Sequence, residues 1–171
     1  MESIDCLLPL LAEPPACDDR VAELYRYWRS IQPAEDRLPG RQHVDPLAIP
    51  RLLPWLRLYD VQRAPLRFRY RLVGTESVRL LGRDPTGQWF DEAFPNVLTT
   101  RSHENMVGVA MGGVLAYRRG VPPAILVGHD NGDSEFILLP LARDGSAIDM
   151  LIGLTVPLSA DAIVEIVPAE A

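Results

Sequence analysis

The stretch RFRYRLVGT, residues 67–75, carries the clearest structural pattern in the chain. Apolar and charged side chains alternate along it, with Phe68, Tyr70 and Leu72 on one face and Arg67, Arg69 and Arg71 on the other. A period of two is typical of a β-strand that buries one face and exposes the other. The pattern therefore predicts an antiparallel strand over residues 66–73, ended by Gly74 and Thr75.

Further elements are predicted on both sides of this strand from apolar spacing and from the turn residues between them. Ala64 and Pro65 connect it to a strand that precedes it, and Gly82 closes a short helix that follows it. In chain order, the predicted elements are a strand at 56–61, the strand at 66–73, a helix at 76–81, short helical turns within 82–95, a helix at 97–111, and strands at about 113–119, 134–143 and 147–156. Two strands thus precede a helical crossover, and three strands follow it.

An amphipathic helix is predicted near the N-terminus, because apolar residues recur at helical spacing after the candidate caps Asp18 and Asp19. Its apolar side chains are Val21, Leu24, Tyr25 and Trp28. Pro33, Pro39 and Gly40 follow this helix, and they indicate a linker. We therefore divide the chain into a mobile tail at 1–17, the helix and linker at 18–44, a core domain at 45–158 and a C-terminal tail at 159–171.

Composition places the chain among globular proteins and excludes several kinds of active site. It has 171 residues, of which 47% are hydrophobic, and this suits one globular domain. The formal net charge of -6 argues against broad binding of nucleic acid, whose affinity comes largely from Lys and Arg at phosphates. None of the 17 basic residues is a lysine, so Schiff-base, P-loop and catalytic-base lysines are excluded.

The cellular location is predicted from the cysteines and the apolar runs. Cys6 and Cys17 are too few for a disulfide framework or a metal site of paired cysteines, which favours a reducing compartment. The first residues lack the positive region of a signal peptide, and no apolar run approaches the ~20 residues that span a bilayer. We expect a cytoplasmic protein without a membrane partner.

The order of elements, two strands, a helical crossover and three strands, is that of a PAS domain, an α+β fold with a five-stranded antiparallel sheet. The matching strings are YWRSI at 27–31, DPLAIPRLLPWLRLYDV at 45–61, FRYRLVGTE at 68–76 and LLGRDPTGQWFDE at 80–92. Together they resemble a bacterial family of single-domain PAS proteins of the alphaproteobacterial type. The resemblance covers roughly Leu24 to Pro157 and is most specific in the first half.

The resemblance implies a module that senses a small ligand or contacts a protein, with the N-terminal helix packed against the sheet. It brings no catalytic residue, so we expect no enzyme activity. The last predicted strand ends near Val156, and about 15 mostly small residues follow, which leaves no room for an effector domain. We therefore expect the signal to pass to a separate signalling protein.

A candidate ligand pocket is predicted between the sheet and the 97–111 helix, because such pockets combine apolar walls with a few polar groups. The alternative is a core filled by side chains. A small apolar ligand in this pocket would have Arg101 or His103 as its polar anchor. The candidate lining residues are Tyr70, Trp89, Phe90, Phe94, Arg101, His103, Met106 and Met111.

The histidines allow two alternatives, haem binding and catalysis. His103 lies on the apolar side of the 97–111 helix, where haem-binding PAS domains carry an iron ligand, but we expect a structural role and no haem. His129 lies near Asp130 and Asp133, and either His103 or His129 would be the general base if the chain were a small enzyme. The string Asn-Gly-Asp beside His129 is also ordinary hairpin-turn chemistry, which we favour. No two of the three histidines, which include His43, have metal-ligand spacing.

Two surfaces are candidates for contact with a partner. The last two strands are apolar on both faces, so the sheet needs cover on each side, either from the N-terminal helix of the same chain or from a second subunit. We expect a homodimer that uses Val21, Leu24, Tyr25 and Trp28 of that helix. The second surface is the row of Arg67, Arg69 and Arg71. Three alternatives are open for this row: it is a solvated face, it docks on an acidic partner, or it forms ion pairs with Asp18, Asp19 and Glu23.

Overall fold

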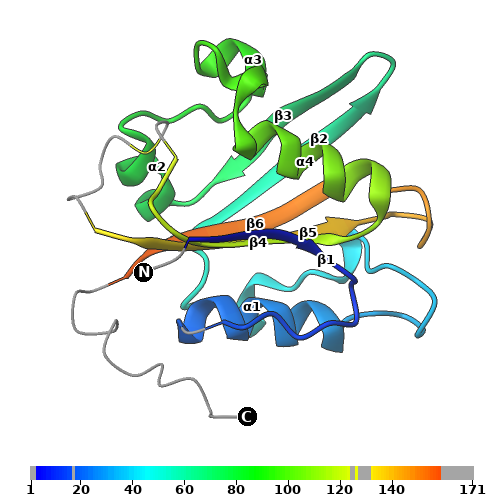
Figure 1. Cartoon of the computed structure of the whole chain (residues 1–171). Helices are drawn as coiled ribbons and strands as arrows, with labels where there is room; N and C mark the ends of the chain where they lie inside the picture. The colour runs from blue at the N-terminus through cyan, green and yellow to red at the C-terminus, as the bar shows by residue number, and fades with distance from the viewer. Residues whose placement is uncertain (1–2, 17, 124–125, 127–131, 159–171) are drawn as a thin grey trace.

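A computed structural model describes residues 3–16, 18–123, 126 and 132–158. An antiparallel sheet forms the middle layer, with helix α1 on one face and helices α2, α3 and α4 on the other (Figure 1). The predicted α+β class is confirmed. Among the described helices, none is long and apolar enough to cross a bilayer.

The sheet has six strands in the order β1-β4-β5-β6-β2-β3, and every pairing in it is antiparallel. Strand β3 has the predicted bounds, β2, β4, β5 and β6 begin and end within a few residues of the predicted positions, and β1 was not predicted. The strands are β1 (Ile4–Leu8), β2 (Leu56–Arg63), β3 (Leu66–Val73), β4 (Leu115–Gly120), β5 (Ser134–Leu141) and β6 (Met150–Pro157).

Strand β1 corrects two predictions, the mobile tail and the number of strands. Ile4–Leu8 pairs along β4, from Ile4 opposite Arg119 to Leu8 opposite Leu115. Pairing satisfies the N–H and C=O groups along the edge of β4, which are costly to leave unpaired where they are buried. The run of five residues is short and is followed by Pro9, so its period of two is hard to recognise in the sequence.

Helix α1 (Asp19–Ser30) covers one face of the sheet (Figure 1). The side chain of Asp18 accepts a hydrogen bond from the Arg20 N–H at 2.9 Å, which caps the helix. Inside the molecule, the Trp28 indole Nε1 donates to the Pro140 carbonyl at 2.8 Å. The core on this side contains Val21, Leu24, Tyr25 and Trp28, together with sheet residues such as Ile137 and Leu154.

The prediction that these four helix residues form a dimer surface is wrong. They are between 0% and 6% exposed in the single chain, because they already pack on that chain's own sheet. The alternative, cover by the same subunit, is the one observed. A homodimer stays a prediction and requires another surface.

The opposite face of the sheet carries α2 (Thr75–Leu81), α3 (Phe90–Ala93) and α4 (Arg101–Gly112). Thr100 begins α4 by accepting a hydrogen bond from the His103 N–H, and Gly113 ends it with a φ of 59° that favours glycine. Both faces of β5 and β6 are therefore buried, as their apolar sequences predict. Three short 3₁₀ helices complete the described chain: Arg41–His43, Pro46–Ala48 and Val97–Thr99.

The alternation along β3 is confirmed only in part. Phe68 and Tyr70 are buried, whereas Leu72 is 41% exposed. The pairing of β2 with β3 shifts between Leu58 and Tyr59, so Arg71 is an extra residue on β3. A bulge of this kind moves the next side chain out of the alternation.

Candidate functional site

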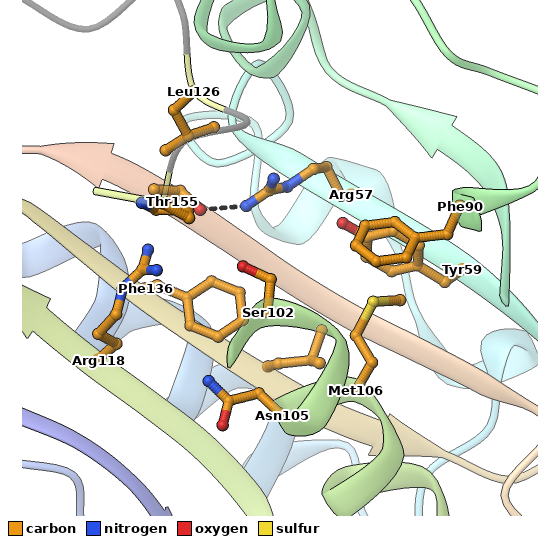
Figure 2. A pocket seen from close by; sticks show the side chains of 12 residues that line it. Arg57, Tyr59, Phe90, Ser102, Asn105, Met106, Arg118, Leu126, Phe136 and Thr155 are labelled. Carbon is orange, nitrogen blue, oxygen red and sulfur yellow. Dashed lines mark hydrogen bonds between the residues drawn. The ribbon is translucent and has the colours of Figure 1, made fainter. Parts of the chain in front are cut away.

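A small cavity of about 30 Å³ lies between the sheet and α4 (Figure 2). It is on the side of the sheet where the pocket was predicted. Its size is that of two or three water molecules, since one water needs about 10–15 Å³ measured in this way. The lining residues are Arg57, Tyr59, Phe90, Ser102, Asn105, Met106, Arg118, Pro123, Leu126, Phe136, Leu138 and Thr155.

The sheet register places two arginines at opposite ends of one row of side chains. Arg118 on β4 is opposite Phe136 on β5, and Phe136 is opposite Thr155 on β6. On β2, Arg57 is opposite Gly153, two residues from Thr155 and on the same face of β6. Strands β4 and β2 are three spacings apart, about 14 Å at ~4.8 Å each, so two long side chains reach toward each other over the row.

Arg57 is a buried charge in an apolar strand, flanked by Leu56 and Leu58. It is only 4% exposed. One guanidinium nitrogen, Nη2, donates to the Thr155 hydroxyl, and Figure 2 shows the side chain extended toward that residue. The Nε atom has no hydrogen-bond acceptor in the part of the chain that the structure describes.

Arg118 approaches the same row from the other side (Figure 2). It is 8% exposed, its Cζ lies 5.5 Å from the centre of the Phe136 ring, and its Nε finds no acceptor among the described residues. Burial, with the charge of Arg57 as a smaller cause, lowers the pKa of Arg118 to about 10, against the attraction of Asp5. The two guanidinium groups therefore act on each other electrostatically.

Helix α4 supplies the wall opposite the sheet, with Ser102, Asn105 and Met106 facing the cavity. Asn105 is 2% exposed, and its Nδ2 donates to the Asp5 carboxylate of β1 at 3.0 Å. The same carboxylate lies 3.3 Å from the Arg101 Nε. Strand β1 thus holds the turn of α4 that borders the cavity.

Two of the eight predicted pocket residues, Phe90 and Met106, line this cavity. Tyr70 and Phe94 are buried beside it, where the Tyr70 ring lies 5.9 Å from Phe90 and 6.3 Å from Phe94. The other residues that line the cavity, among them Arg57 and Arg118, were not predicted.

Trp89, Arg101 and Met111 lie outside the cavity. Trp89 stacks under the Arg67 guanidinium at 4.4 Å, and Arg101 pairs with Glu104 at 2.9 Å. Met111 is 64% exposed on the last turn of α4. A helix rotates by ~100° per residue, so Arg101 and Met111 on α4 do not lie on the same face as Met106.

His103 borders a second hollow of about 100 Å³, beside Phe68, Phe90 and Asp91. Its ring stacks on Phe90 with centres 6.4 Å apart and meets the edge of Phe68 at 6.1 Å. Asp91 is already bound to Arg67 at 3.0 Å. His103 and Met106 therefore face different spaces, and His103 is not the polar anchor of the cavity.

The other histidines do not assemble a metal or acid–base site in the described chain. His43 Nδ1 accepts a hydrogen bond from the Gly40 N–H at 2.9 Å, which is a structural role. His129 and Asp130 lie outside the described residues. Within the residues that were searched, no group of three metal-binding side chains occurs.

The arginines of β3 contact nearby groups instead of the N-terminal helix. Arg67 binds Asp91 and also Glu92, the latter at 2.7 Å, and Arg69 donates to the Gly87 carbonyl at 3.0 Å. The alternative in which they pair with acidic residues of the N-terminal helix is not observed, because Asp18 is held by Arg20 at 2.7 Å and Glu23 lies 4.0 Å from Arg51.

The residues that the sequence reasoning missed are mainly the two buried arginines. A signal for them exists in the sequence, since Arg57 stands in the apolar run LPWLRLY and Arg118 in the strand LAYRRG. A charge inside a strand that is buried on both faces is uncommon and needs a partner. The sequence alone does not show that both side chains turn to the same face and border one cavity.

Comparison with known proteins gives one match to a family model, described as "PAS domain", over residues 18–156. No curated protein matches the chain. One solved structure, "Structure of an RNA-binding Light-Oxygen-Voltage Receptor", is similar with a TM-score of 0.47 and 13% sequence identity. That alignment covers 91% of this chain and 39% of the receptor chain. With the family model matching most of its length, the chain belongs to the PAS domain family, whose members are sensory and signalling domains.

Proposed function

We propose that this PAS domain is a sensor that binds a small ligand in the cavity between the sheet and α4 and passes the signal to a separate protein. The cavity carries this proposal. It combines apolar walls with two buried arginines whose Nε atoms have no acceptor among the described residues. Apolar walls with a few convergent polar groups are the usual composition of a small-molecule site.

The position of the cavity supports a signalling role. Its walls come from the sheet, from α3, from α4 and from residues 123 and 126 after β4, so an occupant contacts four parts of the fold at once. A ligand shifts a conformational equilibrium only by its different affinity for the two states. An occupant held between α4 and the sheet has contacts that change if α4 moves.

The proposal is tested by thermal-shift screening of the purified protein against small metabolites. A ligand that binds only the folded state stabilises it by ~2.7 kcal/mol at a hundredfold excess over its Kd, so a binder raises Tm. We expect at least one such compound, and we expect its effect to disappear in Met106→Trp and in Ser102→Leu, which fill the cavity.

Met111→Trp is the matched control, because Met111 lies on the same helix but is 64% exposed. It should respond to the ligand as the unmodified protein does. If no compound stabilises the protein, or if both cavity variants respond in full, the chain is an interaction module without a ligand in this cavity.

We propose no catalytic role for His103. Its ring contacts Phe68 and Phe90, and the carboxylate nearest in the same hollow is engaged by Arg67. A general base needs hydrogen-bond reach to its substrate and usually an orienting partner. The described surroundings of His103 supply aromatic contacts instead.

A further inference from the structure

We propose that the ligand of this cavity is a small carboxylate, whose oxygens accept hydrogen bonds from Arg57 and Arg118. This inference rests on the proposed function and names the chemical class of the ligand.

The charge of the site favours an anion. Arg57 and Arg118 are both more than nine-tenths buried, and taking a charge out of water is costly unless it is paired. Among the described residues, Asp5 is the carboxylate that acts on Arg118, yet it is shared with Asn105 and Arg101. Two buried positive charges therefore border the cavity, and the described carboxylate that acts on Arg118 is also paired with Arg101.

The geometry points both arginines at one place. Arg57 is fixed by its bond to the Thr155 hydroxyl, and Arg118 lies over the ring of Phe136, the residue opposite Thr155 on the next strand. Each has an Nε that lacks an acceptor in the described chain. The space between them is bordered by both side chains, as Figure 2 shows.

The size and walls select a carboxylate among anions. A guanidinium presents its donors in a planar fork that matches the two oxygens of a carboxylate. The cavity of about 30 Å³ fits a group of a few heavy atoms. Beyond the arginines, Met106, Phe136 and Leu138 form an apolar wall that suits a short hydrocarbon chain. Of the polar side chains in the lining, Thr155 already accepts from Arg57 and Asn105 already donates to Asp5, so the further oxygens of a phosphate would meet few donors.

The first experiment measures Tm with sodium formate, acetate, propionate and butyrate, each matched by sodium chloride at equal ionic strength. Propionamide serves as the neutral compound of similar shape to propionate, and sodium phosphate as the alternative anion. We expect Tm to rise with carboxylate concentration, saturably, and to stay unchanged with propionamide, chloride and phosphate.

The second experiment repeats the titration with Arg57→Gln and Arg118→Gln. Each should lose at least tenfold in affinity for the carboxylate that binds best. Arg71→Gln is the matched control, because it makes the same change of charge on exposed β3 and should keep full affinity. Thr155→Val, which is close in shape, removes the hydroxyl that positions Arg57 and should weaken binding even if an arginine variant fails to fold.

The outcomes separate this inference from the proposed function. A neutral compound that raises Tm, is blocked by Ser102→Leu and is unaffected by the arginine variants would uphold the cavity as a ligand site and overturn the carboxylate. Stabilisation by phosphate but not by carboxylates, or equal stabilisation by propionamide and propionate, overturns it as well. The absence of any stabilising compound overturns both proposals.

Discussion

At the scale of single residues, the aromatic layer beneath α3 depends on two buried tyrosines. The rings of Tyr59 and Tyr70 lie 4.9 Å apart, and Tyr70 is fully buried. Burial, with the neighbouring Tyr59 as a smaller cause, raises the pKa of the Tyr70 hydroxyl well above 10.0. The folded state therefore keeps the neutral phenol to a higher pH than the unfolded state does.

This difference predicts how stability depends on alkaline pH. The contribution of Tyr70 is complete below the unfolded pKa of about 10 and is lost as pH rises above it, because the unfolded chain then releases the proton first. We expect Tyr70→Phe to lose less of its free energy of unfolding than the unmodified protein does between pH 9 and pH 11, values chosen about one unit either side of that pKa.

Urea unfolding at the two pH values measures this loss. Tyr27→Phe, at a half-buried position on α1, is the control and should behave as the unmodified protein. An equal loss in Tyr70→Phe and in the unmodified protein would show that this hydroxyl does not govern the alkaline decline.

At the scale of elements, α1 is defined by its cap and by its buried face. Asp18 accepts hydrogen bonds from the Arg20 backbone at 2.9 Å and from the Arg20 side chain at 2.7 Å. Burial raises the pKa of the Asp18 carboxyl, but these bonds to Arg20 outweigh it, and the pKa lies below 3.8. The ionised cap is therefore stabilising at neutral pH, and this contribution is lost as pH falls through that range.

The cap contributes measurably to the stability of α1. Asp18→Ala removes the acceptor at the start of α1 and should lower the free energy of unfolding by about 1 kcal/mol at pH 7. Asp19→Ala, at the exposed first position of the helix, is the matched control and should change stability by less than half as much. Urea titrations of both variants make the comparison, and equal losses would contradict the role assigned to the cap.

At the scale of the whole molecule, the sheet is stable because both faces are covered. Four side chains of α1 are almost fully buried on one face, and each contributes ~1.5–3 kcal/mol by burial, so the helix supplies about 6–12 kcal/mol. Domains of this size have a total stability of ~5–15 kcal/mol. The helix is thus an integral part of the fold.

Deletion of residues 1–32 should therefore give insoluble or unfolded protein, because it exposes the apolar face of β5 and β6. Expression and circular dichroism of the truncated chain provide the test. The full-length double variant Arg26→Ala, Arg29→Ala changes the exposed face of the same helix and should stay soluble and folded. A truncated chain that is soluble and unfolds cooperatively would show that another part of the molecule, or a second subunit, covers this face.

Sequence alone is enough for the order of the elements from β2 onward, the bounds of β3, the amphipathic helix at 19–30 and the membership of the PAS family. Each of these is encoded by the spacing of residues within a short window or by local strings. Part of the cavity lining was also within reach of the sequence, since Phe90 and Met106 border the cavity, whereas their binding of a ligand stays a prediction.

Which charges are buried, and which apolar faces are already covered, depends on contacts between residues far apart in the chain. Leu72 is exposed because of a shift in pairing with β2, and Ile4–Leu8 is a strand because β4 offers it an edge. Arg57 and Arg118 are 61 positions apart in numbering, and only the register of four strands brings them to one cavity. Burial depends on what packs across from a residue, and that partner is distant in sequence.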